Sequence, residues 1–405
     1  MNGDYDAIVI GTGALGSSTA FHLTKLGKKV ALLDRFEVAS QSSPRAAGLT
    51  MQIRSEADMT EVAMRSLAKI RAFEEETGEP LLYHQSGSVK MARTDEDARK
   101  VEAEIVAGQA LGLDIMAIDE HDLARLAPWA RTTGVQAIWY TPSDIYFQPG
   151  QLPVGYTRAA ERLGATVLPH TEVTSIERRN GSVTGVNTTK GAIHAPHVVD
   201  AAGAWARKIA AESDIHVPIQ PMRHQLMITE PIDGVEDTQP ICRVIDVNVY
   251  VRPDNGGLLL GGYEPNPLPI DMTTVRAGFR VADLPLDLGV LRSLAGKVRD
   301  QFPGLETAPI REHRGGIPTM TADGRLIVGP VPGVSGFYAA TGCCVGGLSS
   351  SPAFGQALAE LIAGKKPSIP LDPFSIARFG PELATDEAIR EAGIRSYTNQ
   401  YAVNN

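Results

Sequence analysis

The stretch Ala7-Ile8-Val9-Ile10-Gly11-Thr12-Gly13-Ala14-Leu15-Gly16 decides the fold of this chain. Its first four residues form a short apolar run, which is typical of a strand buried on both faces. The glycines then follow the spacing G-x-G-x-x-G, and a helical pattern covers residues 14–26. A second apolar run, residues 30–33, ends at Asp34. Together these segments predict a strand–turn–helix–strand unit that binds a nucleotide.

Each residue of this unit has a separate predicted role. Gly11 permits the tight turn, Gly13 lets the backbone approach a pyrophosphate, and Gly16 lets the helix pack close to the strand. The helix start offers free N–H groups and a positive dipole to phosphates. Asp34 stands where a carboxylate accepts hydrogen bonds from ribose hydroxyls. The residues expected at this end of a cofactor are Gly11, Gly13, Ala14, Gly16, Asp34 and Arg35.

A second glycine-rich turn favours FAD over NAD. Residues 342–347 read Gly-Cys-Cys-Val-Gly-Gly, and they precede a helix expected from Pro352 to Gly364. A reduced flavin gains negative charge over N1 and C2=O, which a helix N-terminus would stabilise. Simple helix capping is the alternative interpretation. The residues expected at this end are Gly342, Val345, Gly346, Gly347 and Leu348.

A buried strand late in the chain predicts an interrupted nucleotide domain. Residues 197–200 (His-Val-Val-Asp) read as a buried strand that ends in the small residues Ala201, Ala202 and Gly203, followed closely by Trp205. Such a strand belongs in the first sheet, so Ala202, Gly203 and Trp205 are expected near the nucleotide. Residues 218–314 show many short strands, which suggests an antiparallel sheet, and one helix near 288–302. Residues 139–149 read as turn-rich.

The predicted fold class is therefore α/β, with two domains. A Rossmann-like FAD-binding domain with a mostly parallel sheet comprises residues 1–83, 149–217 and 315–371. An α+β substrate domain with a large, mostly antiparallel sheet comprises residues 84–148 and 218–314. Residues 372–405 are expected to form a C-terminal tail, either free or covering the active site.

Composition excludes several function classes. The net charge of −9, without any Lys/Arg-rich run, argues against nucleic acid. No stretch has the apolar length of a membrane span, and the N-terminus lacks the pattern of a signal peptide. Three cysteines cannot build a disulfide framework, so we expect a cytoplasmic location. The histidines form no ligand-spaced cluster, so no metal is expected. The sequence is compatible with an oligomer.

Five motifs, in this order, give the chain a family resemblance. They are Gly11–Gly16 with Asp34, residues 45–50 (Arg-Ala-Ala-Gly-Leu-Thr), residues 200–205 (Asp-Ala-Ala-Gly-Ala-Trp), residues 257–264 (Gly-Leu-Leu-Leu-Gly-Gly-Tyr-Glu) and residues 342–352. The chain resembles the D-amino acid oxidase superfamily of flavoproteins, and most nearly its sarcosine oxidase and dimethylglycine dehydrogenase branch. The resemblance implies FAD and hydride transfer from the carbon next to nitrogen to flavin N5. It also implies an imine that hydrolyses, with formaldehyde released from an N-methyl substrate.

The resemblance also extends the set of cofactor residues. It adds Ser42, Arg45, Ala46, Ala47, Gly48, Val173 and Gly316. Two of them depart from the family pattern, because Arg45 replaces the histidine that carries a covalent flavin in dimethylglycine-type members. Gly316 likewise stands where sarcosine oxidases have an anchoring cysteine. Both departures predict that FAD is held non-covalently.

Two further departures concern the oxidant and the substrate. Aligning on Gly262-Tyr263 places Leu260 where sarcosine oxidases have a lysine that promotes reaction with oxygen. The electron acceptor is therefore left open between O2 and an electron-accepting partner. Ser349 replaces a lysine that helps to bind the substrate carboxylate, while Arg54 matches an arginine near the flavin and that carboxylate.

The expected catalytic residues are His224, Tyr250, Arg54 and Arg252. His224 matches a histidine near the substrate in dimethylglycine-type enzymes, where it could position the amine or accept a proton. The alternative is a hydrogen-bonded strand histidine. Tyr250 and Arg252 share one strand face, which points to a pocket or to water, and both suit a carboxylate. The alternative for Arg252 is a surface charge. Cys343 and Cys344 are expected beside the flavin as small, adaptable side chains.

The expected activity is oxidation of a C–N bond in a small secondary or tertiary amine or N-methyl amino acid. Three alternatives stay open from the sequence. The first is a dehydrogenase of glycine, D-amino acids or 2-hydroxy acids with the same fold. The second is the FAD subunit of a heteromeric dehydrogenase, and the third is an NAD-dependent enzyme.

Overall fold

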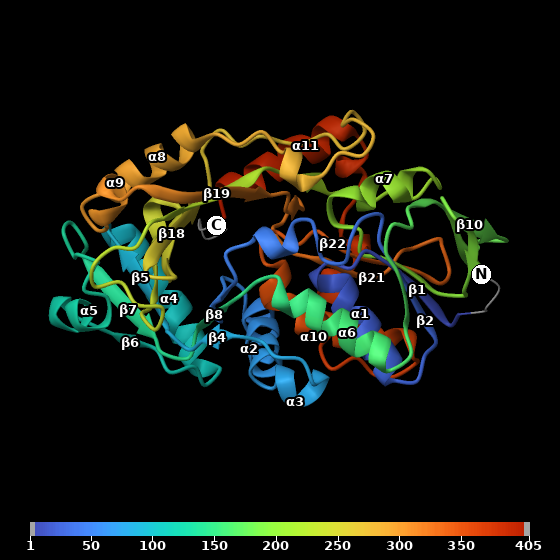
Figure 1. Cartoon of the computed structure of the whole chain (residues 1–405), viewed down its shortest axis with the longest axis horizontal. Coiled ribbons are helices and arrows are strands. Elements are labelled where there is room, and N and C mark those ends of the chain that lie inside the picture. Colours follow the sequence, from blue (N-terminus) through green and yellow to red (C-terminus); the bar gives the residue numbers. More distant parts are fainter. Residues whose placement is uncertain (1–4, 401–405) are drawn as a thin grey trace.

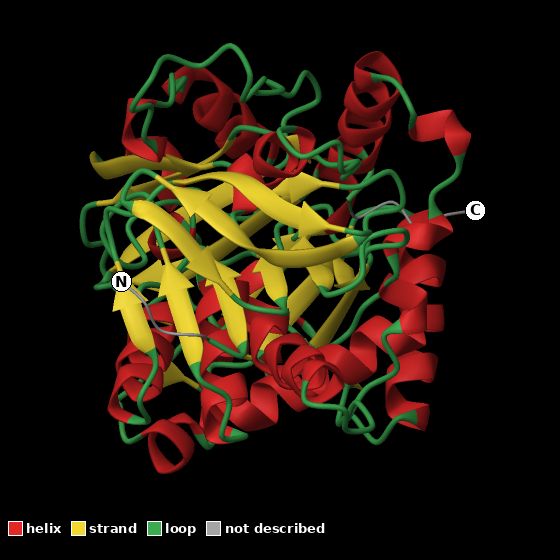
Figure 2. Ribbon diagram, turned by 90° about the vertical axis from the view of Figure 1, so that its right-hand side faces the viewer, coloured by secondary structure: helices red, strands yellow, loops and turns green. Residues whose placement is uncertain are grey.

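The computed structural model describes residues 5–400 and contains two large sheets that lie next to each other (Figures 1 and 2). The first sheet has the strand order β21-β22-β13-β1-β2-β9. Its central strand β1 pairs in parallel with β2 and β13, and only β21 runs antiparallel. The strands are β1 (Ala7–Ile10), β2 (Val30–Leu33), β9 (Thr166–Leu168), β13 (Val198–Asp200), β21 (Ile327–Pro330) and β22 (Phe337–Thr341). Four separate parts of the chain therefore build one mostly parallel sheet, as expected.

Helices cover one face of this sheet, seen at the lower right of Figure 1. They are α1 (Ala14–Lys25), α2 (Ala57–Arg71), α3 (Phe73–Thr77), α6 (Gln151–Arg162) and α10 (Gly347–Ile362). Phe21, Tyr156 and Phe354 are buried in the core beneath them. A Cβ on Gly355 would overlap Ser18, so α1 and α10 approach each other closely. The two glycine-started helices are thus direct neighbours.

The opposite face of the first sheet carries a small antiparallel sheet and a short helix. These are β10 (Val173–Arg179), β11 (Ser182–Thr188), β12 (Gly191–His194) and α7 (Ala206–Ala211). Their apolar side chains join a second buried cluster that includes Ile8, Ala31 and Val198. Because both faces are covered, the strands of the first sheet are continuous apolar runs.

The second large sheet has the order β19-β15-β18-β17-β16-β5-β7-β6. All its pairings are antiparallel except that of β16 with β5. Its strands are β5 (Ser88–Ala92), β6 (Met116–Ala117), β7 (Ala137–Thr141), β15 (His224–Thr229), β16 (Ile241–Val244), β17 (Val249–Asp254), β18 (Gly257–Gly262) and β19 (Ile310–Gly316). β19 crosses the boundary expected between residues 314 and 315, and the domain limits themselves stay predictions.

Smaller elements complete the chain. They are β3 (Leu49–Thr50), β4 (Tyr83–His84), β8 (Ile145–Phe147), β14 (Gln220–Pro221), β20 (Thr319–Met320), α4 (Asp95–Ala110), α5 (Glu120–Leu126), α8 (Leu288–Lys297), α9 (Gly304–Thr307) and α11 (Asp386–Thr398), with short 3₁₀ turns such as η1 (Ser43–Arg45) and η2 (Gly203–Trp205). Within residues 5–400, no helix has the length and apolar character needed to cross a bilayer. The three cysteines carry free thiols, and the cytoplasmic location stays a prediction.

Two local expectations differ from the structure. Residues 139–149 are not turn-rich throughout, because β7 and β8 occupy residues 137–141 and 145–147, whose aromatic and apolar side chains suit strands. Helix α10 begins at Gly347 rather than at Pro352. Pro352 has no N–H for the carbonyl of Leu348, and the hydroxyl of Ser351 donates to that carbonyl instead, at 3.4 Å.

Candidate active site

A cavity of about 480 Å³, here called the larger cavity, runs between the two glycine-rich helix starts. Most of the residues expected around a cofactor line it. They are Gly11, Gly13, Ala14, Asp34, Arg35, Ser42, Arg45, Ala46, Val173, Ala202, Gly203, Trp205, Gly316, Val345, Gly347 and Leu348. Segments more than 300 residues apart in sequence therefore face one space, which suits an extended ligand.

The first helix start has the geometry that its glycines predict. Gly11 has φ +101°, and a Cβ there would stand 2.5 Å from the carbonyl oxygen of Ala201. A Cβ on Gly16 would overlap the carbonyl oxygen of Gly11. The missing side chain of Gly16 therefore allows close helix packing, and Gly16 does not line the larger cavity. At Gly13 a Cβ would lie 3.3 Å from Ser43 Oγ, which accepts a hydrogen bond from the N–H of Ala14.

Asp34 joins the end of β2 to this turn. Its carboxylate accepts hydrogen bonds from the N–H and Oγ1 of Thr12, at 2.9 and 2.6 Å, and from the N–H of Phe36 at 2.9 Å. Burial raises the pKa of Asp34, and these hydrogen bonds act in the opposite direction. An ionised carboxylate offers about four acceptor sites, so capacity is left for a ligand hydroxyl in the larger cavity.

The second helix start is built differently. Cys344 and Val345 have φ of +41° and +66°, whereas Gly346 has φ −90°. The N–H groups of Cys343 and Cys344 donate to Oγ1 and the carbonyl of Thr319, at 3.0 and 2.9 Å, so the turn is fixed to β20. Val345 lines the cavity from a backbone conformation that is strained for a β-branched residue.

Four other expected cofactor residues lie outside the lining of the larger cavity. Gly342 lines neither cavity, because its φ of +62° serves the turn and a Cβ there would meet Thr321 at 2.6 Å. A second cavity, which adjoins the larger one and is described next, is lined instead by Ala47, Gly48 and Gly346. Several residues of the larger cavity were not anticipated, because no sequence motif marks them; they include Phe36, Gln41, Ser43, Lys208, Ile317 and Thr319.

A second cavity of about 210 Å³, here called the smaller cavity, adjoins the first. The two share the lining residues Ala46, His224, Cys343, Val345 and Leu348. Arg54, Tyr250 and Tyr263 line the smaller cavity only. A molecule in the smaller cavity would therefore meet the ligand of the larger cavity beside His224 and Val345.

His224 is held between two tyrosine hydroxyls. Its Nδ1 lies 2.7 Å from Tyr397 Oη, and its Nε2 lies 2.9 Å from Tyr250 Oη. A neutral imidazole has one donor and one acceptor nitrogen, so the two tyrosines satisfy both. Burial lowers the pKa of His224 to about 4. The histidine is thus uncharged at neutral pH and fixes the Tyr250 hydroxyl at the smaller cavity.

Tyr397 comes from α11, in the segment expected to be a tail. It is fully buried, and its ring packs 5.1 Å from that of Tyr263. Burial raises the pKa of Tyr397 well above its usual value, so the hydroxyl keeps its proton. Sequence reasoning missed this residue because 173 positions separate it from His224. Helix α11 therefore packs over this site.

Arg54 lies at the smaller cavity, as expected for a carboxylate ligand. Its Nη2 donates to Ser349 Oγ at 3.2 Å, and Ser349 Oγ in turn donates to the carbonyl of Gly346 at 3.0 Å. The guanidinium is therefore tied to the start of α10, close to the junction of the two cavities.

Arg252 is the one expected catalytic residue that lines neither cavity. Its side chain is only 1% exposed, so the alternative of a surface charge is also wrong. The guanidinium donates to the carbonyl of Ala47 at 2.8 Å, pairs with Asp254 at 3.0 Å and stacks over Tyr146. Arg252 shares a face with Tyr250, but two residues of strand carry it about 7 Å farther along.

The position assigned to Leu260 is also corrected. Its side chain joins the buried cluster that includes Val251 and Leu294, on the face of the sheet covered by α8. Successive strand residues alternate between faces, so Leu259 and Gly261 point to the other face, on which Tyr250 lies. Neither of them carries a charge.

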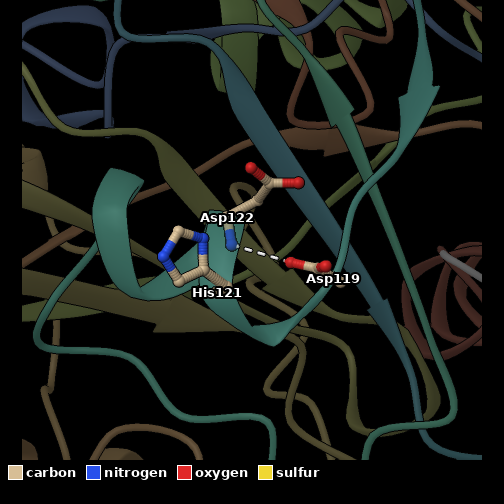
Figure 3. A group of neighbouring side chains, drawn as sticks. All are labelled: Asp119, His121 and Asp122. Atoms are coloured by element: carbon tan, nitrogen blue, oxygen red, sulfur yellow. Dashed lines mark hydrogen bonds between the residues drawn. The ribbon is translucent and has the colours of Figure 1, made fainter.

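Among the described residues, one group of three His, Cys, Asp or Glu side chains has its potential metal-ligating atoms within 4.8 Å of one another. It consists of Asp119, His121 and Asp122 (Figure 3). Asp119 accepts a hydrogen bond from the N–H of Asp122 at 2.9 Å and thereby caps α5. Asp119 therefore serves as a helix cap, and none of the three residues lines either cavity.

The larger cavity fits an FAD molecule. Neither α1 nor α10 has a side-chain cap or an acidic residue in its first turn, so both starts can receive a negatively charged group. The glycine turn leaves room for a pyrophosphate, and the opposite end is lined by small or apolar side chains such as Ala46, Leu226 and Leu348. That combination suits a flat ring system.

Comparison with known proteins agrees with this fit. A model of the DAO family, described as FAD dependent oxidoreductase, matches residues 6–361. Mitochondrial sarcosine dehydrogenase of Mus musculus is 30% identical over 98% of this chain and 44% of its own length. The formaldehyde-forming 4-methylaminobutanoate oxidase of Paenarthrobacter nicotinovorans is 28% identical over 92% of this chain and 45% of its own. This chain therefore spans less than half the length of both curated relatives.

Among solved structures, L-proline dehydrogenase from P. horikoshii superposes with a TM-score of 0.84 at 26% identity, covering 94% of this chain and 98% of that one. The family model spans both helix starts and the return strand between them. The chain therefore belongs to the DAO family of FAD-dependent oxidoreductases.

Proposed function

We propose that this enzyme oxidises the C–N bond of a secondary or tertiary amine that also bears a carboxylate, such as an N-methyl amino acid or a cyclic imino acid. The observation that carries the proposal is the smaller cavity, which meets the cofactor cavity beside His224 and presents Arg54 to a carboxylate. The names of the relatives support it, since they act on sarcosine, 4-methylaminobutanoate and L-proline.

The protein side chains would bind and orient the substrate. Arg54, directed by Ser349, binds the carboxylate through charge-assisted hydrogen bonds. The Tyr250 hydroxyl, held by neutral His224, contacts the amine nitrogen. A partly desolvated cavity lowers the pKa of an amine, and only the neutral amine can release hydride from the adjacent carbon.

FAD, when bound, supplies the hydride acceptor. A neutral secondary amine loses a hydride to the flavin and its N–H proton to water and becomes an imine, whereas a tertiary amine loses only the hydride and becomes an iminium. Water then hydrolyses either product. An N-methyl substrate yields formaldehyde and the demethylated amine. The residues of the smaller cavity keep bulk water from the reacting carbon until hydride has left.

The cofactor linkage and the electron acceptor belong to the same proposal. Non-covalent FAD is supported by Arg45 and Gly316, which line the cavity at the two positions where an anchor would stand. An acceptor other than O2 is supported by the uncharged Leu259 and Gly261, which lie on the face of the sheet that Tyr250 shares. Acid precipitation should release the flavin into solution, and flavin that stays with the pellet would contradict this linkage.

The test is anaerobic bleaching of the flavin by N-methyl amino acids, L-proline, D-amino acids and 2-hydroxy acids. Arg54→Gln should lower kcat/KM for the N-methyl substrate about 100-fold, because a charged hydrogen-bonding partner is lost. Arg54→Lys should recover part of that loss, since it restores the charge without the planar fork. Bleaching by 2-hydroxy acids alone, or by amines without a carboxylate at equal rates, would overturn the proposal.

A further inference from the structure

Lys90 and Arg243 stand next to Tyr250 in one row across the second sheet. Arg243 on β16 is the register partner of Tyr250 on β17 and of Lys90 on β5. Strands lie about 4.8 Å apart, so the two cations lie one and two strands beyond Tyr250. Both line the smaller cavity with Tyr250. A molecule that contacts Tyr250 with its amine can therefore extend toward two positive charges.

Both cations are buried, at 8% and 4% exposure for Lys90 and Arg243. Glu104 of α4 forms an ion pair with Lys90. Burial is the main reason why the pKa of Lys90 falls to about 8, while Glu104 raises it and Arg243 lowers it again. Like charges on directly paired residues are unfavourable. The fold therefore keeps two cationic side chains buried side by side at a position where packing alone favours apolar side chains.

The charges of the described cavity lining point the same way. Four cationic side chains face two carboxylates there, namely Arg54, Lys90, Lys100 and Arg243 against Glu56 and Glu104. Lys100 is already held by Glu96, at 2.7 Å on the same helix. Arg54 is tied through Ser349 to the start of α10, whereas Lys90 and Arg243 lie on β5 and β16. The cavity is thus lined by cationic side chains from two different parts of the fold.

We propose that Lys90 and Arg243 bind a second carboxylate of the substrate, so that the preferred substrates are N-substituted acidic amino acids. Arg54 takes the carboxylate next to the oxidised C–N bond, and the Lys90–Arg243 pair takes the carboxylate of a short acidic side chain. This inference rests on the proposed function and names its substrate class.

The experiment compares two substrates that differ only in the distal charge, N-methylglutamate and N-methylglutamine, each as both enantiomers. Anaerobic flavin reduction by the holoenzyme gives kcat/KM for each. The wild-type enzyme should prefer the glutamate derivative about 10-fold or more, since a charged hydrogen bond is made only with that substrate. N-methylaspartate and N-methylasparagine repeat the test with a shorter side chain.

Variants then locate the preference. Arg243→Gln should reduce it to about one by lowering kcat/KM for the glutamate derivative only, and Arg243→Lys should recover part of it. Arg54→Gln should lower kcat/KM for both substrates by the same factor. The control is Arg299→Gln, an exposed arginine beyond α8, which should change neither. Flavin content and melting temperature identify variants that fail to fold.

A second readout does not depend on turnover. Glutarate should bind the holoenzyme more tightly than butyrate, as measured by perturbation of the flavin spectrum, and Arg243→Gln should remove the difference. Equal kcat/KM for the glutamate and glutamine derivatives in the wild-type enzyme would overturn this inference and leave the proposed function intact. If no N-methyl amino acid bleaches the flavin, the proposed function itself fails.

Discussion

Two glycine-rich helix starts face the cofactor cavity, and they differ in which residues adopt a positive φ. At the first, Gly11 has a positive φ, and the absence of a side chain on Gly16 leaves room for the carbonyl of Gly11, as the motif requires. At the second, Cys344 and Val345 take a positive φ as well as Gly342, while Gly346 does not. Glycine content alone therefore does not identify which residues carry the strained backbone.

The difference places strain at the second turn. The first turn uses glycine for its unusual backbone and stores little strain. The second turn instead has Val345 in a left-handed conformation, and His224, which lines the same cavity, is buried and uncharged. Strained and desolvated groups persist only where the surrounding structure holds them, and they concentrate at functional sites.

The largest effect is expected at the first turn. Gly16→Ala should cost more than about 3 kcal/mol and abolish FAD binding, because the new Cβ overlaps the carbonyl of Gly11. Flavin absorbance and thermal unfolding measure both effects. The matched control is Gly346→Ala at the second turn, where the nearest atom would lie 3.5 Å away, and a change within about 1 kcal/mol is expected. An equal loss of stability and of flavin binding in Gly16→Ala and Gly346→Ala would contradict the difference between the two turns.

An intermediate effect is expected from His224, through pH. Its pKa is about 4 in the folded protein against the ordinary 6.5, so the unfolded chain binds more protons between these values. The free energy of unfolding should therefore fall as pH drops from 6.5 to 4, by about 3 kcal/mol from this group. In the His224→Gln variant, most of this decrease in the free energy of unfolding between pH 6.5 and 4 should be absent. Denaturant unfolding of both proteins at several pH values decides it, and parallel pH profiles would show that the histidine is not desolvated.

The smallest effect is expected at Val345. Val345→Gly should be more stable than Val345→Ala by about 1 kcal/mol, because both lack the isopropyl group and only glycine accepts the left-handed conformation without strain. Thermal unfolding of the two holoproteins measures the difference. If alanine proves the more stable residue at this position, the strain assigned to the second turn is absent.

Local patterns predicted the first sheet and the nucleotide end almost completely. Residues 7–34 lie where the motif implies, because a turn and its flanking strands depend on near neighbours. The second turn was located but its helix start was misplaced, since Pro352 is typical of a first turn and the Ser351 hydroxyl replaces its missing N–H.

Residues brought together by distant pairing could not be predicted in the same way. Arg252 was expected in the substrate cavity, but its place depends on Asp254 and on the carbonyl of Ala47. Lys90 and Arg243 become neighbours only through the parallel pairing of β5 with β16. No spacing in the sequence reports that register.

The late position of α11 in the chain separates two events during synthesis. Every residue that lines the cofactor cavity has left the ribosome by Leu348, whereas Tyr397 emerges about fifty positions later. A nascent chain can therefore enclose its cofactor while the imidazole of His224 still has water in place of its tyrosine partner. The tyrosine partner of His224 arrives only when α11 packs against β14 and β20.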